Sequence, residues 1–209
     1  MMPRRVSGAA ALAVVAVVGS AALLGCGTTK APAAAQAVAA VQGSAISAGA
    51  LAHWIAIKRS ELQSSSKPTP TIPTQVREEA LAFLITADWL EKEAAGQGVG
   101  VSASEVDATY QQLLNAPTGQ SFAASLKSRG ISSADELRLL RLAALAQKLR
   151  TKIALSYHSA STTQARQHIS AFIAAYRRQW KQRTTCRQGY IIAECSNGPP
   201  LPAAPESGS

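Results

Sequence analysis

Apolar residues recur at intervals of three and four positions along most of the chain, a spacing that is typical of amphipathic helices. Ser47 is placed to cap a first helix that runs to about Leu62. A second helix is expected from Thr74 onward, with Gly96 and Gly98 ending it. Its apolar stripe consists of Val76, Ala80, Phe83, Leu84, Ala87 and Leu90. Residues 63–73 between the two helices predict a loop, because prolines are frequent there.

Two capping boxes, each a serine followed three positions later by a glutamate, predict the starts of further helices. Ser102 and Glu105 begin a helix that ends before Pro117, and Ser133 and Glu136 begin a long one. That long helix is expected to run to about Tyr157. Residues 122–129 predict a short amphipathic helix between the two.

A last helix is expected to begin at a cap formed by Thr162 or Thr163. One of its faces is apolar and carries Ile169, Phe172, Ile173, Tyr176 and Trp180. Residues 38–42 are expected to be extended, with a turn at Gly43-Ser44, and residues 190–193 are a second strand candidate. The pattern as a whole predicts a mainly α fold.

The N-terminal 25 residues have the features of an export signal. Arg4 and Arg5 precede an uncharged apolar run, Val6 to Leu24, and a small residue follows before Cys26. This arrangement resembles the lipobox of bacterial lipoproteins, in which the cysteine is acylated and becomes the first residue. The sequence therefore predicts a signal peptide over 1–25, lipidation at Cys26 and a flexible tether over 26–37. The alternatives are an uncleaved membrane anchor, for which the run is long enough, and simple secretion.

Cys186 and Cys195 are the other two cysteines of the chain. In an exported protein they are expected to form a disulfide, and the alternative is a pair of free thiols. Residues 196–209 are rich in proline and small polar residues, which predicts a disordered tail.

The 209 residues carry 21 basic and 12 acidic side chains, a net charge of +9. The charge is segregated: residues 27–126 carry 6 basic and 8 acidic groups (−2), and residues 127–209 carry 13 and 4 (+9). The basic half fits either solvated helix faces or contact with anionic lipid, wall polymer or acidic clients. Export argues against a nucleic-acid partner.

No catalytic arrangement is evident in the sequence. His53, His158 and His168 have no second ligand three or four residues away, so neither a metal site nor a cofactor is expected. A phosphate-binding glycine loop and a nucleophilic serine motif are also lacking.

Several short motifs, in this order, resemble SurA/PrsA-type foldases, in particular their actinobacterial lipoprotein versions. They are the lipobox at Cys26, Val38–Ser47 leading to His53-Trp54, Leu84-Ile85 with Trp89–Ala94, Val99–Ser102 with Glu105-Val106, Ala134–Leu137, Leu149–Ile153, and Trp180 with Thr185–Tyr190 and Cys195. The resemblance covers residues 38–197 and implies an N-terminal chaperone domain over 38–195. It also implies that the last helix joins this domain and that the strand near Tyr190 pairs with the one near Val38.

The parvulin-type prolyl isomerase domain of these foldases has no counterpart between the long helix and the last helix. The expected function is therefore that of an exported holdase, lipid-anchored at the outer face of the membrane, that binds unfolded polypeptides. The client-contacting candidates, which are alternatively core residues, are Trp54, Phe83, Trp89, Leu113, Phe122 and Leu126. Other hypotheses are prolyl isomerisation, as the family name suggests, and docking to one dedicated partner.

Overall fold

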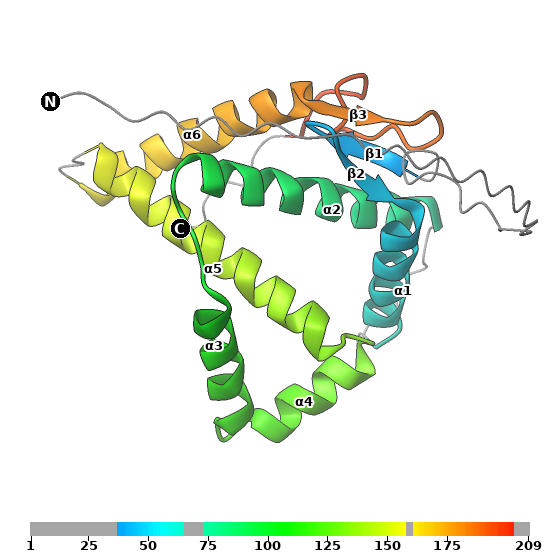
Figure 1. Cartoon of the computed structure of the whole chain (residues 1–209), viewed down its shortest axis with the longest axis vertical. Helices are drawn as coiled ribbons and strands as arrows, with labels where there is room; N and C mark the ends of the chain where they lie inside the picture. The colour runs from blue at the N-terminus through cyan, green and yellow to red at the C-terminus, as the bar shows by residue number, and fades with distance from the viewer. Residues whose placement is uncertain (1–36, 65–72, 158–160, 203–209) are drawn as a thin grey trace, which may run out of the picture. The chain divides into compact units, whose positions relative to one another are not determined.

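The computed structural model describes residues 37–64, 73–157 and 161–202. Within these ranges the chain forms six helices and one small sheet, which confirms the mainly α class (Figure 1). The helices are α1 (Ala48–Ser64), α2 (Pro73–Gly96), α3 (Ala103–Asn115), α4 (Gly119–Ser128), α5 (Ser133–Ser156) and α6 (Thr162–Gln182). The strands are β1 (Ala37–Val41), β2 (Ser44–Ser47) and β3 (Thr184–Cys186). All these residues lie in one unit of the chain, Ala31–Ser209.

The sheet has the order β2-β1-β3, and both pairings are antiparallel. Gln42 and Gly43 both have positive φ (49° and 86°), as the tight hairpin between β1 and β2 requires. Ala39 is opposite Cys186, so the predicted pairing of the two ends of the domain is confirmed.

Two details of the predicted strands were wrong. Ser44 begins a strand, β2, instead of belonging to a turn that leads directly into α1. The C-terminal strand is Thr184–Cys186, and Tyr190–Ala193 is not a strand. The physical reason is that the backbone turns back twice around that segment, where Tyr190 N donates to Arg187 O and Cys195 N donates to Ile192 O.

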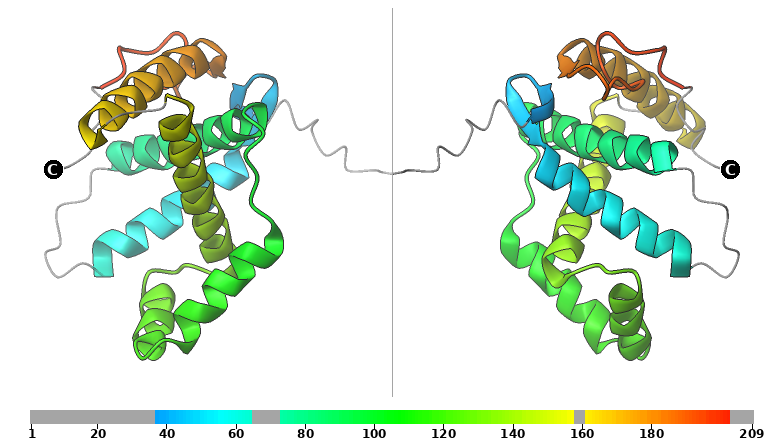
Figure 2. Two further views of the ribbon diagram at one scale, coloured as in Figure 1. Left: turned by 90° about the vertical axis from the view of Figure 1, so that its left-hand side faces the viewer. Right: turned by 90° about the vertical axis from the view of Figure 1, so that its right-hand side faces the viewer.

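The core lies between the sheet, α1, α2 and the C-terminal segment. Helix α2 contributes most to it, and Ala80, Ile85 and Trp89 are completely buried. Views from two opposite sides show α2 between α6 with the sheet on one side and α1 with α5 on the other (Figure 2). Because α2 is covered from several directions, every residue from 81 to 94 is buried or partly buried.

The predicted cap of α1 and the first capping box are confirmed. Ser47 Oγ accepts from Ala50 N at 3.1 Å, and Ser102 and Glu105 cap each other at the start of α3. Helix α2 begins at Pro73, one residue before the predicted cap, because proline suits the first helical position, where no N–H is needed.

Two other helix starts differ from the prediction by one residue. Helix α5 is capped by Ser132 with Asp135, in place of Ser133 with Glu136. In this frame Asp135 Oδ1 also lies 2.8 Å from His53 Nε2 of α1, and Glu136 is buried. Helix α6 is capped by Ser161 instead of a threonine.

A second apolar cluster, formed by Ala94, Val101, Val106 and Leu145, joins α3 to α2 and α5. Cations of α5 hold the segment that leads into α3: Arg141 donates to Val101 O at 3.1 Å, and Lys148 donates to Gly100 O at 3.2 Å. Lys148 also donates to Glu105 Oε1 at 2.6 Å. Helix α3 is thereby fixed on α5 by apolar and polar contacts together.

The C-terminal segment is ordered further than expected. Residues 196–202, which were predicted to belong to a disordered tail, are held in place by α6 and β3. Lys181 Nζ donates to Gly198 O at 3.1 Å, Arg177 donates to Pro202 O at 3.0 Å, and Ser196 N donates to Thr184 O at 2.8 Å. Residues 203–209 lie outside the described part of the chain.

In the described ranges, no helix combines the length and the apolar character that crossing a bilayer needs. The apolar run Val6–Leu24 is not within those ranges, and neither is Cys26.

Candidate functional site

An apolar groove of about 320 Å³ lies between α2, α5 and α6. Each helix contributes residues at helical spacing, so each presents a continuous stripe to the same space. The lining residues are Phe83, Thr86, Ala87 and Leu90 of α2, Leu142, Ala146, Leu149, Arg150 and Ile153 of α5, and Ile169, Phe172, Ile173 and Tyr176 of α6. This groove is the candidate functional site.

The side chains that the three helices contribute to the groove differ in how far they are buried. Leu142, Leu149 and Ile153 of α5 are buried, whereas the α6 residues Ile169 and Phe172 are only partly buried. Apolar surface therefore remains accessible on the α6 side of the groove. Accessible apolar surface within a concavity is typical of binding sites.

The groove offers few polar atoms to a ligand. The Thr86 hydroxyl is occupied within its own helix, since it donates to Ala82 O at 2.7 Å. Burial and the nearby carboxylate of Glu93 raise the pKa of the Tyr176 phenol, so this group is neutral at physiological pH. Arg150 is the one lining residue with a charged side chain. Such a site has little means of fixing one ligand orientation by directional bonds.

The C-terminal half of α6 is firmly attached to α2. Trp180 is buried and its indole Nε1 donates to Glu93 Oε2 at 2.8 Å. The ring of Tyr176 meets Trp89 edge to face at 6.3 Å between centroids. The N-terminal half of α6 contacts the end of α5 instead, where His168 stacks on Tyr157 at 4.1 Å.

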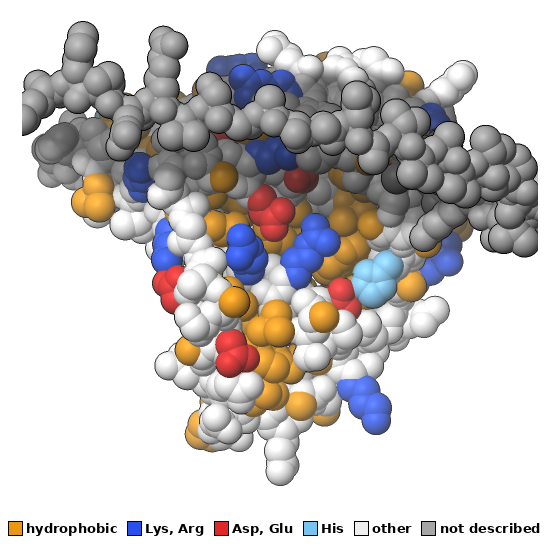
Figure 3. All heavy atoms as spheres, in the orientation of Figure 1, with side chains coloured by type: hydrophobic (Ala, Val, Ile, Leu, Met, Phe, Trp, Pro, Cys, Tyr) orange, Lys and Arg blue, Asp and Glu red, His pale blue; other side chains and the backbone are white. Residues whose placement is uncertain are grey.

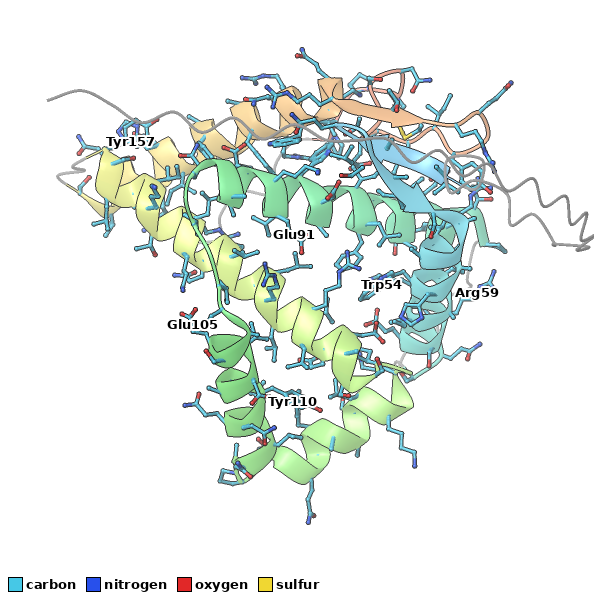
Figure 4. The ribbon with its side chains drawn as sticks, viewed as in Figure 1. Trp54, Arg59, Glu91, Glu105, Tyr110 and Tyr157 are labelled. Atoms are coloured by element: carbon cyan, nitrogen blue, oxygen red, sulfur yellow. A yellow bond between two sulfur atoms is a disulfide. The ribbon has the colours of Figure 1, made fainter. Side chains whose placement is uncertain are left out.

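The structure places the six predicted client-contacting residues in different environments. Trp54, Trp89 and Leu126 are buried in the core, and Trp89 Nε1 donates to Thr184 Oγ1 at 2.7 Å. Trp54 lies on the side of α1 toward α2 and packs against Phe83 at 4.3 Å between ring centroids (Figure 4). For these three side chains the structure shows the core environment that was the alternative interpretation.

Phe83 is the one of the six that lines the groove. Leu113 and Phe122 are partly buried on α3 and α4 and do not line the groove. The ring of Phe122 lies 6.3 Å from that of Tyr110 between centroids, and Tyr110 is labelled on α3 in Figure 4. The spacing of apolar residues in the sequence predicts the apolar face of α6, but it does not show that this face lines a groove. The feature that points to a binding role is that this apolar face continues over three turns of a helix that is rich in cations.

Cys186 and Cys195 form a disulfide with an S–S distance of 2.10 Å and Cα atoms 5.7 Å apart. It closes the loop that follows β3, next to β1 in the sheet. The part of the chain that the structure describes holds no cluster of three or more histidine, cysteine or acidic side chains suited to a metal ion.

Comparison with protein families gives one match, over residues 2–150, to a family described as SurA-like N-terminal domain. The matched segment includes α1 to α4 and most of α5. Neither the curated proteins nor the solved structures compared with the chain gave a match.

Proposed function

This chain belongs to the family of SurA-like N-terminal domains, and we propose that it is a membrane-anchored chaperone that binds unfolded exported polypeptides in the groove between α2, α5 and α6. A chaperone-like role in general and an extracytoplasmic location follow from the family. The groove, the clients and the anchor are the proposal. The observation that carries it is the partly exposed apolar stripe of α6 facing the stripes of α2 and α5.

Unfolded chains expose apolar side chains, and burying them in the groove removes that surface from water. Each fully buried large aliphatic or aromatic side chain contributes about 1.5–3 kcal/mol. The groove volume of about 320 Å³ accommodates only part of a client, so affinity for any one segment is expected to be modest. The scarcity of polar groups makes binding tolerant of sequence, which suits a protein with many clients.

The test is a paired assay with one substrate whose refolding is limited by proline isomerisation: aggregation and refolding rate are followed together. We expect the protein to suppress aggregation without accelerating refolding. Acceleration would instead support the isomerase hypothesis. Capture of one partner with neither effect would support the hypothesis of a dedicated docking protein.

Variants of the groove make the test specific. Phe172→Ser removes a large, partly exposed side chain from the α6 wall and is expected to weaken client binding about tenfold. Leu155→Ser is the matched control, because Leu155 is 70% exposed and lies outside the groove. Equal chaperone activity of the two variants would contradict a role for the groove.

The anchor is tested separately by labelling cells with a clickable fatty acid. Acylation is proposed at Cys26, following cleavage of residues 1–25, so Cys26→Ser is expected to abolish labelling and to leave the precursor uncleaved. Persistent labelling of that variant would exclude Cys26 as the modified residue.

A further inference from the structure

The described residues after α5 carry many cations and few acids. In the sequence no aspartate or glutamate occurs between Glu136 and Glu194. Helix α6, its C-cap and the loop after β3 together carry six basic residues, which are Arg166, Arg177, Arg178, Lys181, Arg183 and Arg187.

These cations are not neutralised by carboxylates within the described ranges. The cations in salt bridges there are His53, Lys58, Lys92, Arg129 and Lys148, all of which precede α6. Those of α6 and the loop contact neutral groups instead. Lys181 donates to Ala193 O at 2.8 Å, Arg183 lies over the Trp180 ring at 5.3 Å, and Arg187 lies over the Tyr190 ring at 5.0 Å. Their positive charge therefore remains available to an external partner.

The cations lie on a different side of α6 from the groove. Arg177, Arg178 and Lys181 border a separate hollow with Pro200–Pro202, and none of them lines the apolar groove. The segment after β3 passes over α6 on the side away from α2 (Figures 1 and 2). Lys and Arg side chains are visible along this upper edge in the space-filling view (Figure 3).

The same region exposes an apolar side chain. Ile191 is 42% exposed and stands in the loop that the Cys186–Cys195 disulfide closes. Arg187 belongs to that loop as well, and its N–H donates to Val38 O of β1 at 3.0 Å. An exposed isoleucine and an exposed arginine on one covalently closed loop, whose single acidic residue, Glu194, is buried, are suited to a lipid–water interface.

The position of the chain's entry into the fold indicates which anionic partner this surface meets. β1 begins at Ala37, beside Arg187. Residues 26–36 are eleven residues long and reach at most about 40 Å when fully extended. A lipid at Cys26 would therefore hold this end of the fold close to the bilayer.

We infer that the outer side of α6 and the disulfide loop, through Arg178, Arg187 and Ile191, dock on an anionic phospholipid bilayer. The inference draws its orientation from the proposed anchor but not from client binding. With this surface on the membrane, the groove on the other side of α6 is left accessible to clients.

The test uses residues 31–209, which lack Cys26 and contain the whole unit in which the described contacts lie. Flotation compares vesicles of phosphatidylcholine with vesicles in which half is phosphatidylglycerol. We expect binding only to the anionic vesicles, and its loss at high salt. Equal binding to both vesicle types, or none to either, would overturn the inference.

Paired variants separate this surface from general charge. Arg178→Gln with Arg187→Gln is expected to lower the partition coefficient about 30-fold, the usual effect of two basic side chains at an anionic surface. Arg59→Gln with Lys127→Gln removes the same charge from exposed positions of α1 and α4 and is expected to have a much smaller effect. Equal losses in the two pairs would refute the assigned surface.

The apolar contribution has its own control. Ile191→Ser is expected to weaken vesicle binding several-fold, and Leu155→Ser, in the last turn of α5, is expected to leave it unchanged. Binding to poly-glutamate in place of vesicles, with the same dependence on Arg178 and Arg187, would overturn the inference in favour of an acidic polypeptide. Failure of vesicle binding with intact aggregation suppression would leave the proposed chaperone function standing.

Discussion

Replacing Thr184 by valine tests how the C-terminal segment is attached to the rest of the fold. The Thr184 hydroxyl accepts from Trp89 Nε1 at 2.7 Å and donates to Trp180 O at 2.8 Å. Thr184 and Trp89 are both completely buried. Valine has nearly the same shape but can make neither bond, so Thr184→Val removes the polar link between α2, α6 and β3 with little change in packing.

Thr184→Val is expected to lower the free energy of unfolding by about 2 kcal/mol. An indole N–H left buried without an acceptor costs about 1–3 kcal/mol. The Trp180 carbonyl loses less, because it still accepts from Arg183 N at 3.0 Å. The added methyl group of valine offsets about 0.8 kcal/mol. For a unit of this length, the resulting loss should lower the melting temperature by about 4–8 °C.

A double-mutant cycle identifies the bond itself. Urea unfolding is followed by tryptophan fluorescence for Thr184→Val, Trp89→Phe and the double variant. Phenylalanine has no N–H to leave unsatisfied. The double variant should therefore lose less free energy of unfolding than the two single variants lose together, by about 1 kcal/mol or more. Losses that add within about 0.5 kcal/mol would show that the two side chains do not interact.

Three further predictions follow from the geometry. The cysteines of the disulfide are 9 positions apart, so its reduction should lower the free energy of unfolding by about 2.6 kcal/mol by the chain-entropy relation. A urea midpoint that does not change in dithiothreitol would contradict this. Ser132→Ala should destabilise the fold by about 1 kcal/mol and Ser133→Ala by much less, and the reverse order in thermal melts would refute the observed cap. The Lys148 ammonium holds the pKa of Glu105 at about 2, below its usual 4.5. The stability that Glu105 contributes is therefore complete above pH 4.5 and lost as the pH falls towards 2; an NMR titration that gives the ordinary value would exclude this.

The sequence predicted the helices well because each carries an apolar stripe with a recognisable start. The box at Ser102 was predicted correctly, and the one at Ser133 was displaced by one residue. Ser132 and Asp135 also fit the pattern of a serine followed three positions later by an acid, so the pattern alone does not choose between them. The choice depends on tertiary contacts, in which Asp135 meets His53 and Glu136 is buried.

The candidate site was harder to predict because periodicity shows that a face is apolar but not what covers it. Trp89 and Phe83 belong to the same apolar helix, yet Trp89 is completely buried and Phe83 lines the groove. The difference arises from β3, whose Thr184 covers Trp89. The strand itself was predicted at the wrong residues, because Tyr190–Ala193 has a stronger strand composition than Thr184–Cys186. The loop geometry that prevents an extended segment there is not visible in composition.

The groove exists because α6 contacts α5 near its N-terminus and α2 near its C-terminus and leaves a space between these contacts. Trp180 is buried near its C-terminus, where Glu93 and β3 hold it, while the other apolar side chains on its inner face are only partly buried. A helix packed along its whole length would have buried Ile169 and Phe172 and closed the space. The family match ends at residue 150, before α6, yet α6 forms one wall of the groove and β3 completes the sheet. The matched region alone would therefore lack both the third wall of the groove and the cover over Trp89. If the groove is the site of client binding, the segment beyond the family match is as necessary to it as the segment within.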